Sequence, residues 1–214
     1  SLFNSLGSEV TVIEMLPKIL GPMDDEISSL LQAQYAKKGV QFFLGCKVTA
    51  IEGSDVVFET ASGEECRAAG DKILLSVGRR PRVRGIGLEN IGVEVQRGIV
   101  VNARMETSVP GVYAAGDVTG FSMLAHTASK EAGTAVANML GVSEEMSYDA
   151  IPGIVYTNPE AAGVGLTEQD ACPDIRIVKL PMAYSGRFVA ENERGEGLCK
   201  VLVDPSGRVL GVHM

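Results

Sequence analysis

Residues 10–44 read VTVIEMLPKILGPMDDEISSLLQAQYAKKGVQFFL, and this stretch determines the fold class. The β-branched run Glu9–Glu14 is typical of a strand. Apolar side chains then recur at helical spacing over Asp24–Lys38, with acidic residues at the start and Lys-Lys-Gly at the end, which predicts an amphipathic helix. A short apolar strand is expected at Val40–Leu44. The order of strand, helix and strand predicts an α/β unit.

The next segments extend this alternation and add an antiparallel insertion. Three of them, separated by turns, read as strands of a small meander: Lys47–Glu52, Val56–Thr60 and Glu64–Ala69. The apolar run Lys72–Val77 predicts a buried strand that ends in the basic turn Gly78–Pro81. An insertion of this kind before the final strand suggests an α/β unit of the nucleotide-binding type.

The second half of the chain changes in character. Gly111–Ala115 predicts a strand, and an alanine-rich segment from about Met123 to Leu140 predicts a long helix that Gly141 ends. From Ile151 onward, prolines interrupt short strands, which indicates an antiparallel domain. Its strands are expected at Arg176–Pro181, Gly197–Val203 and Arg208–Val212.

The composition excludes several classes of protein. The chain has 214 residues, of which 45% are hydrophobic and 21% charged, so we expect a sizeable core and no disorder. A net charge of −8 argues against nucleic-acid binding by phosphate neutralisation. No apolar run approaches the ~18–20 residues of a membrane helix, and the first residues lack the basic region of a signal peptide. The chain opens within an expected helix and ends in an expected strand, so we expect a fragment of a longer protein.

Cysteine and histidine are too sparse for a local metal site. The four cysteines form no close pair, so neither a zinc knuckle nor a local dithiol is encoded: Cys46, Cys66, Cys172 and Cys199. Free thiols in a reducing cytosol are the simplest interpretation. Because only His126 and His213 are present, we expect neither a catalytic triad nor a bound metal.

Two strand ends carry candidate nucleotide-binding residues. Glu14 ends the first expected strand, where dinucleotide-binding folds place an acid that accepts hydrogen bonds from the adenosine ribose. Such an acid favours NAD, because it would repel the additional phosphate of NADP. A solvated acid at a strand end is the simpler alternative. Gly78 would let the backbone approach a ligand closely, although an ordinary strand exit before Pro81 is the alternative here.

A second candidate site surrounds an acidic turn. Asp117 follows a run of small residues at the carboxyl end of an expected strand, where parallel sheets bind ligands. It would accept a hydrogen bond from a ribose or ribitol hydroxyl, or else cap its own turn. The next helix starts at Met123, Leu124, Ala125 and His126, and the N–H groups of such a helix start suit the partial negative charge of a reduced flavin. For the His126 side chain, a structural role is the simpler interpretation.

In order and spacing, five segments resemble those of the flavin-dependent disulfide reductases, most closely the dihydrolipoamide dehydrogenases. They are the Glu14 strand, Ser76–Pro81, Thr107–Val118, Met123–His126 and Ile151–Glu160. Each segment alone is a weak signal of this family, but five of them in the order and spacing of the family are a strong one. The Leu-Ala-His triplet in the fourth segment favours the lipoamide enzymes over the glutathione and mercuric reductases.

The resemblance implies FAD and NAD as cofactors and a role for each candidate residue. Glu14 resembles the acid that holds the adenosine ribose of NAD, and Val48 resembles the residue that contacts adenine. Gly78 resembles the backbone turn beside NAD. Asp117 resembles the ligand of the FAD ribitol, and the helix start at Met123 to His126 resembles the segment whose backbone meets the isoalloxazine ring.

The resemblance also implies an α/β fold class with three parts. They are a partial Rossmann-like NAD-binding domain at residues 1–80, the C-terminal segment of the FAD-binding domain at residues 81–149, and the start of an α+β dimerisation (interface) domain at residues 150–214. The family's glycine fingerprints, its redox cysteine pair and its catalytic His–Glu pair have no match here. No catalytic residue is therefore assigned to this chain.

The implied activity of the parent protein is oxidation of a protein-bound dihydrolipoyl group with NAD, by way of FAD and a redox disulfide. The fragment itself is expected to be inactive. Implied partners are a second copy in a homodimer and the lipoyl domains of 2-oxo acid dehydrogenase or glycine cleavage complexes, in the cytoplasm or, in a eukaryote, the mitochondrial matrix. Two alternatives stay open: another flavin disulfide reductase, acting on glutathione, a related thiol or a metal ion, and a non-catalytic nucleotide-binding or assembly module.

Overall fold

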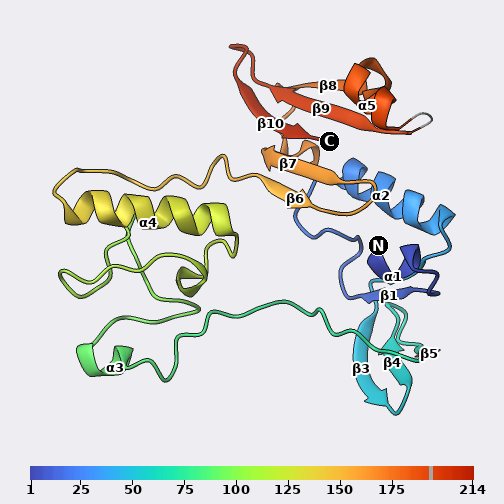
Figure 1. The fold of residues 1–214 in the computed structure, drawn as a ribbon, viewed down its shortest axis with the longest axis horizontal. Coiled ribbons are helices and arrows are strands. Elements are labelled where there is room, and N and C mark those ends of the chain that lie inside the picture. The colour runs from blue at the N-terminus through green and yellow to red at the C-terminus, as the bar shows by residue number, and fades with distance from the viewer. Residues whose placement is uncertain (193–194) are drawn as a thin grey trace. The chain divides into compact units, whose positions relative to one another are not determined.

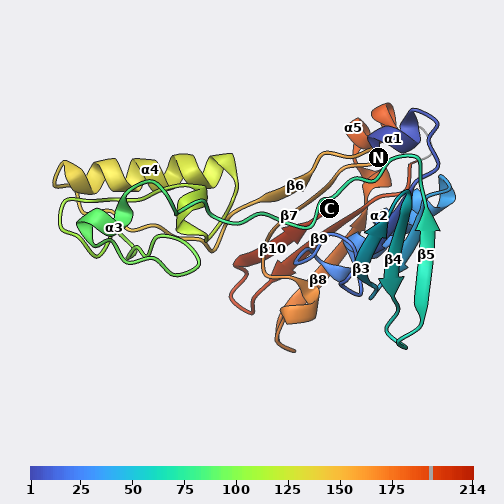
Figure 2. The same ribbon diagram turned by 90° about the horizontal axis from the view of Figure 1, so that it is seen from below.

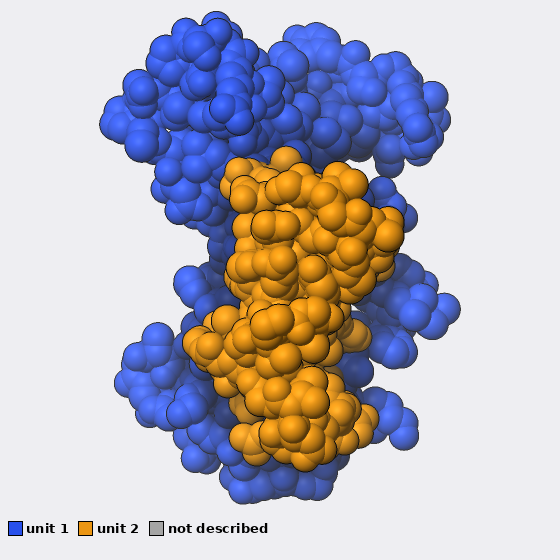
Figure 3. All heavy atoms as spheres, turned by 90° about the vertical axis from the view of Figure 1, so that its left-hand side faces the viewer, with its two compact units in different colours: residues 1–74, 152–214 blue, residues 75–151 orange. Residues whose placement is uncertain are grey.

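The computed structural model describes residues 1–192 and 195–214. The chain divides into two compact units, which Figure 3 shows in blue and orange. The first unit comprises residues 1–74 and 152–214, and the second comprises residues 75–151. Each unit has apolar clusters of its own.

The first unit opens with the predicted strand, helix and strand. Helix α1 (Leu2–Ser5) precedes β1 (Thr11–Glu14), and α2 (Asp25–Lys37) connects β1 to β2 (Gln41–Leu44), which pairs with β1 in parallel. The Asp24 carboxylate caps α2, because it accepts hydrogen bonds from the amides at positions 26 and 27. The prediction for this stretch is confirmed, with boundaries shifted by a few residues.

The antiparallel meander follows directly, and Figure 2 shows its strands side by side. It consists of β3 (Lys47–Glu52), β4 (Asp55–Glu59) and β5 (Glu65–Ala69), in the order β3-β4-β5. The prediction of three antiparallel strands is confirmed to within one residue at each boundary. Phe58 of β4 is fully buried and its ring lies 5.0 Å from that of Phe43, so the meander packs against β2.

The C-terminal part of the first unit is a five-stranded sheet in which every neighbouring pair is antiparallel. In the order β6-β7-β10-β9-β8, its strands are β6 (Gly153–Val155), β7 (Ala161–Gly165), β10 (Val209–His213), β9 (Leu198–Val203) and β8 (Arg176–Pro181). The connections contain η2 (Glu168–Asp170), η3 (Met182–Tyr184) and α5 (Gly186–Glu191). The predicted antiparallel domain is confirmed.

Helix α2 packs against this sheet within the same unit (Figure 1). Ile27, Leu31 and Tyr35 form a buried cluster with Val40 and Ala161, the first residue of β7. The three helical side chains, Ile27, Leu31 and Tyr35, recur on one face of α2. The predicted amphipathic pattern therefore identified the face that is buried. The cluster joins segments that lie far apart in the sequence.

The second unit contains α3 (Leu88–Ile91), η1 (Asp117–Thr119) and the long helix α4 (Ala125–Met139). The prediction of α4 is confirmed. One apolar cluster includes Val93, Ile99 and Ala114, and another includes Met105, Ala135 and Met146. None of the described helices has the length and apolar character needed to cross a membrane.

Two predicted strands are wrong. The run Lys72–Val77 forms no strand, and its side chains at Leu74, Leu75 and Val77 are 76, 65 and 88% exposed. Gly111–Ala115 forms only a single bridge, between Tyr113 and Glu106. Lys72–Val77 is rich in residue types that suit a strand, but a strand forms only where a neighbour supplies a ladder of hydrogen bonds, and none of the described residues does so there. In Gly111–Ala115 only Val112 and Tyr113 favour a strand, and the hydrogen bonds to Met105 and Thr107 do not extend into a ladder.

Candidate functional site

Glu14 lies at the carboxyl end of β1 and is half-buried. Its Oε1 accepts a hydrogen bond from the Leu16 amide at 2.8 Å, and its carbonyl oxygen accepts one from the Cys46 amide at 3.0 Å. The strand end is thereby tied to the loop before α2 and to the link between β2 and β3. The carboxylate lies at the edge where α/β sheets bind ligands.

Val48 lies in a strand of the first unit, whereas Gly78 lies in a connecting segment of the second unit. Val48 lies in β3 of the first unit, is 40% exposed and pairs with Phe58 beside a bulge. Gly78 belongs to the second unit and has a φ of +99°, a backbone conformation that side chains disfavour. The structure therefore places a surface-facing apolar side chain at one position and a glycine-specific turn at the other.

Asp117 opens a tight turn whose backbone requires glycine. Gly116 has φ +83° and ψ −159°, a region that is essentially restricted to glycine. The Thr119 hydroxyl donates to the Gly116 carbonyl at 2.9 Å, which closes the turn. The Asp117 carboxylate is exposed, and none of the described residues donates a hydrogen bond to it. It is therefore available to an external hydroxyl.

The start of α4 lies against this turn. A Cβ atom at Gly116 would lie 3.5 Å from the Cβ of Ala128, so the backbone of the turn meets the first turns of the helix. No side chain caps α4 at Leu124, and uncapped N–H groups at a helix start attract partial negative charge. The exposed carboxylate and the uncapped helix start fit a ligand that has both hydroxyl groups and an electronegative edge.

The side chains that hold this turn were missed by the sequence analysis. Glu131 of α4 is fully buried and accepts hydrogen bonds from the Gly116 amide and from the hydroxyls of Thr119 and Tyr148. It belongs to a polar stripe at helical spacing on the buried face of α4, which consists of Thr127, Glu131, Thr134 and Asn138. That spacing was a usable signal, but a polar stripe ordinarily indicates the solvent-facing side of a helix.

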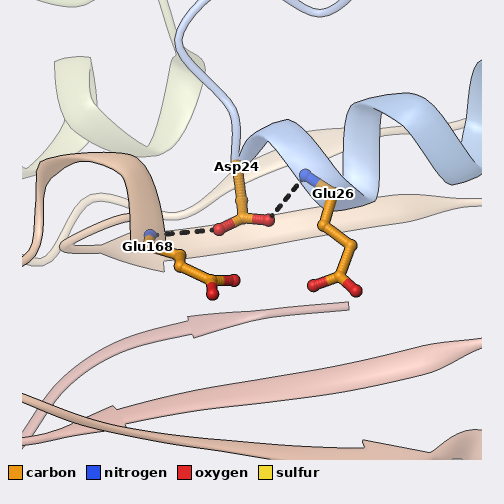
Figure 4. Close-up of side chains that lie close together, drawn as sticks. All are labelled: Asp24, Glu26 and Glu168. Carbon is orange, nitrogen blue, oxygen red and sulfur yellow. Dashed lines mark hydrogen bonds between the residues drawn. The ribbon is translucent and has the colours of Figure 1, made fainter.

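A buried ion-pair cluster in the first unit was also missed. Lys200 of β9 and Asp24 are both fully buried, and Lys200 Nζ lies 2.7 Å from Asp24 Oδ1. The same ammonium lies 2.8 Å from Glu26 Oε2 and contacts the Glu168 carboxylate. Figure 4 shows the three acids, with the Glu168 amide donating to Asp24 at 3.1 Å. Their oxygens are close enough together to hold a cation, and the Lys200 ammonium contacts all three.

The ion pairs shift the pKa values within this cluster. Burial raises the pKa of Asp24, but hydrogen bonds from Lys200 and from backbone amides outweigh burial and leave that pKa lowered. Hydrogen bonds from Lys179 and Lys200 lower the pKa of Glu26, and hydrogen bonds from Lys200 and Lys179 lower that of Glu168. Burial lowers the pKa of Lys200, but its bonds to the three carboxylates outweigh burial and leave that pKa raised.

Acid is therefore expected to destabilise the first unit. The three carboxylates have lower pKa values when folded, so they stabilise the fold above their ordinary values of 3.8 and 4.5, and this contribution is lost as the pH falls through the lowered values. Lys200 stabilises the fold below its ordinary pKa of 10.5, and its contribution is lost only as the pH rises through the raised value. Urea denaturation at a series of pH values measures this profile. If the free energy of unfolding stays constant as the pH is lowered below about 4, the prediction is contradicted.

Known proteins resemble the whole chain. A family model described as pyridine nucleotide-disulphide oxidoreductase matches residues 1–132, and the model described as the dimerisation domain of these proteins matches residues 151–214. The chain is 44% identical over 224 residues to a dihydrolipoyl dehydrogenase of Thermus scotoductus, and 37% identical over 225 residues to a leghemoglobin reductase of Glycine max. Both alignments cover 100% of this chain, but 48% and 43% of the relatives. The chain thus spans about half the length of the curated relatives it matches.

A solved structure resembles the chain over the same extent. The HOCl-induced flavoprotein disulfide reductase RclA from Escherichia coli superposes with a TM-score of 0.84 at 27% identity, and the match covers 100% of this chain and 50% of that one. The expected fold class, a nucleotide-binding α/β part followed by a dimerisation domain, is therefore confirmed.

Proposed function

Because the chain belongs to the pyridine nucleotide-disulphide oxidoreductase family, whose members use FAD and a pyridine nucleotide, we propose that the complete protein oxidises a protein-bound dihydrolipoyl group with NAD. The observation that carries this proposal is the exposed Asp117 carboxylate beside the uncapped start of α4. It occurs in a chain that is 44% identical over its whole length to a dihydrolipoyl dehydrogenase.

Asp117 and the start of α4 hold the flavin in this proposal. The Asp117 carboxylate accepts hydrogen bonds from ribitol hydroxyls, which such an exposed, internally unbonded group is able to do. The backbone of Met123, Leu124, Ala125 and His126 presents the positive end of the helix to the electronegative edge of the flavin ring. When bound, FAD carries the electrons of a dithiol to the pyridine nucleotide as a hydride. The residues of this chain orient the cofactor for that transfer.

Glu14 and Val48, both in the first unit, hold NAD in this proposal. The Glu14 carboxylate accepts hydrogen bonds from the adenosine ribose, and its position at the end of β1 supports this role. The exposed Val48 side chain packs against adenine. Gly78, in the second unit, is assigned to NAD by the family resemblance alone, and its positive φ would let a ligand approach the backbone closely.

The proposal also assigns the parts of the protein. Residues 1–80 belong to the NAD-binding domain, residues 81–149 to the FAD-binding domain and residues 150–214 to the dimerisation domain, whose family model supports a homodimer. The four cysteines of this chain are all unpaired, which supports placing the redox disulfide, like the catalytic His–Glu pair, in another part of the protein. The lipoyl domain of a 2-oxo acid dehydrogenase or glycine cleavage complex is the proposed partner, in the cytoplasm or the mitochondrial matrix.

A second candidate function is reduction of a different substrate by the same cofactors. Two relatives favour it: a leghemoglobin reductase that is 37% identical, and the flavoprotein disulfide reductase RclA, which has a similar structure. Neither of these proteins is named as a dihydrolipoyl dehydrogenase. A glutathione-like disulfide or a metal ion would then replace the lipoyl group.

Steady-state assays of the complete protein separate these candidates. Dihydrolipoamide is supplied with NAD, and glutathione disulfide or Cu(II) is supplied with NADH. We expect kcat/KM for dihydrolipoamide to exceed the other values by at least about 100-fold, which corresponds to ~2.7 kcal/mol in transition-state stabilisation. A higher value for glutathione disulfide or Cu(II) would favour the second candidate. Inactivity with every substrate would favour a non-catalytic nucleotide-binding module.

Replacement of Glu14 tests the nucleotide preference. In Glu14→Ala, we expect the KM for NAD to rise, and the ratio of kcat/KM for NAD over NADP to fall by about tenfold, because a charged hydrogen bond to the ribose is lost and the repulsion of the additional phosphate is removed. Glu9→Ala, which removes an exposed acid just before β1, is the matched control. An unchanged NAD/NADP ratio in Glu14→Ala would remove Glu14 from the site.

A further inference from the structure

A buried carboxylate of α4 holds the turn that presents Asp117. Glu131 is fully buried. Its Oε2 accepts a hydrogen bond from the Gly116 amide at 2.5 Å, and its Oε1 accepts from the Tyr148 hydroxyl at 2.7 Å. The Thr119 hydroxyl shares its one hydrogen between the Gly116 carbonyl at 2.9 Å and Glu131 Oε1 at 3.4 Å. All three donors are neutral, so hydrogen bonds rather than an ion pair hold this carboxyl group.

Glu131 is a polar side chain at a fully buried place where an apolar residue would avoid the cost of burial. The pKa of the Tyr148 hydroxyl is raised, first by burial and then by its hydrogen bond to Glu131 and the nearby carboxylate charge. Tyr148 therefore stays a donor even at pH values near its ordinary pKa of 10. The other two donors, Gly116 and Thr119, flank Asp117 on either side of the turn.

A second segment, at residues 98–99, also fixes the turn. The Ile99 amide donates to the Val118 carbonyl at 2.8 Å. A Cβ atom at Gly98 would lie 2.5 Å from the Thr119 carbonyl oxygen, so only glycine fits at that position. Because none of the described residues bonds to the Asp117 carboxylate, the direction of this side chain depends on the backbone of the turn.

We propose that Glu131 is a positioning residue for flavin binding, which aligns the Gly116–Thr119 turn so that the Asp117 carboxylate meets the ribitol hydroxyls. This inference rests on the proposed function, because it takes the Asp117 site to be a flavin site. Glu131 makes no contact with the cofactor in this account. It acts through Gly116 and Thr119, whereas Tyr148 only completes the hydrogen bonding of the carboxylate.

The first test compares two variants of the complete protein by titrating the flavin-free form with FAD. Glu131→Gln keeps the shape of the side chain but removes its charge and one of its two acceptor oxygens, so we expect the Kd for FAD to rise at least about tenfold. Tyr148→Phe removes a donor to the same carboxylate but leaves both turn contacts, so we expect its Kd to stay within about twofold of wild type. The thermal midpoint of the flavin-free protein should fall in both variants. An equal rise of Kd in the two variants would overturn the inference.

A double-mutant cycle separates positioning from general stabilisation. If Glu131 acts through Asp117, then Glu131→Gln changes the Kd for FAD by less than about twofold once Asp117→Ala is present. A merely structural role predicts the same fold-loss in both backgrounds, and that result would overturn the inference.

Thr119 tests the same contact if Glu131→Gln does not fold. Thr119→Val removes the hydroxyl, and with it the hydrogen bonds to the Gly116 carbonyl and to Glu131, but keeps Glu131 itself. We expect it to weaken FAD binding several-fold, with Thr119→Ser restoring affinity. Unchanged affinity in Thr119→Val would overturn the inference. Loss of flavin in Asp117→Ala alone, with affinity kept in the Glu131 and Thr119 variants, overturns the inference and leaves the proposed function standing. A wild-type protein that binds no flavin overturns both.

Discussion

Replacement of Lys200 with methionine is expected to lower the free energy of unfolding by about 3–5 kcal/mol, because it removes one partner of a buried ion pair. The ammonium is fully buried and is shared by the carboxylates of Asp24, Glu26 and Glu168. Without it, the oxygens of three carboxylates remain within 4.8 Å of one another at the junction of α2 with the five-stranded sheet. Methionine preserves most of the apolar stem, so the loss reports mainly on charge rather than on a cavity.

Lys179 supplies the matched control for this substitution. Its side chain is 40% exposed, and its ammonium lies 2.8 Å from Glu26 Oε2 and 2.9 Å from Glu168 Oε2, two of the carboxylates that Lys200 also contacts. Exposed ion pairs contribute about 0–1 kcal/mol, so Lys179→Met is expected to cost much less than Lys200→Met. Urea denaturation of both variants at neutral pH measures the difference. Equal losses would show that burial of Lys200 adds nothing to the stability of the cluster.

Replacement of Asp117 with alanine is expected to release FAD from the complete protein. A charge-assisted hydrogen bond to a ribitol hydroxyl is worth about 1–3 kcal/mol, which corresponds to a rise in Kd of about 5- to 150-fold. Because none of the described residues bonds to this carboxylate, the flavin-free protein should keep its thermal midpoint. Flavin content after purification and FAD titration measure the effect.

Glu145 offers a control for the loss of a negative charge. It is exposed and belongs to the same unit as Asp117, so Glu145→Ala should leave flavin content unchanged. If Asp117 instead caps its own turn, then Asp117→Ala should lower the thermal midpoint of the flavin-free protein while retaining stoichiometric flavin. That pair of results would remove Asp117 from the cofactor site.

The elements that could be predicted from the sequence are those that local patterns specify. Helix α2 has an acidic N-cap at Asp24 and an apolar stripe, and helix α4 ends at a glycine, so both have signals within a few residues. The meander has turns between short β-branched runs. The apolar segments Lys72–Val77 and Gly111–Ala115 carry strand-like residues, but pairing depends on a neighbouring strand and not on the segment itself.

The polar contacts that hold the candidate site could not be predicted in the same way. Lys200 and Asp24 are 176 residues apart, and nothing in either local sequence indicates the other. Glu131 lies in an alanine-rich helix beside Lys130, where a charged pair ordinarily indicates a solvated face. Only the packing of α4 against the Gly116 turn shows that this acid is buried. Asp117, by contrast, was singled out because it follows small residues at the carboxyl end of an expected strand. That strand does not form, and the role of Asp117 at a cofactor site stays a prediction.

An anaerobic titration of the complete, purified protein, followed by its absorbance spectrum, tests the proposed function most directly. We predict the spectrum of a bound oxidised flavin, which dihydrolipoamide bleaches and NAD then restores. A protein without flavin absorbance would contradict the proposal. So would a bound flavin that NADH reduces but dihydrolipoamide does not.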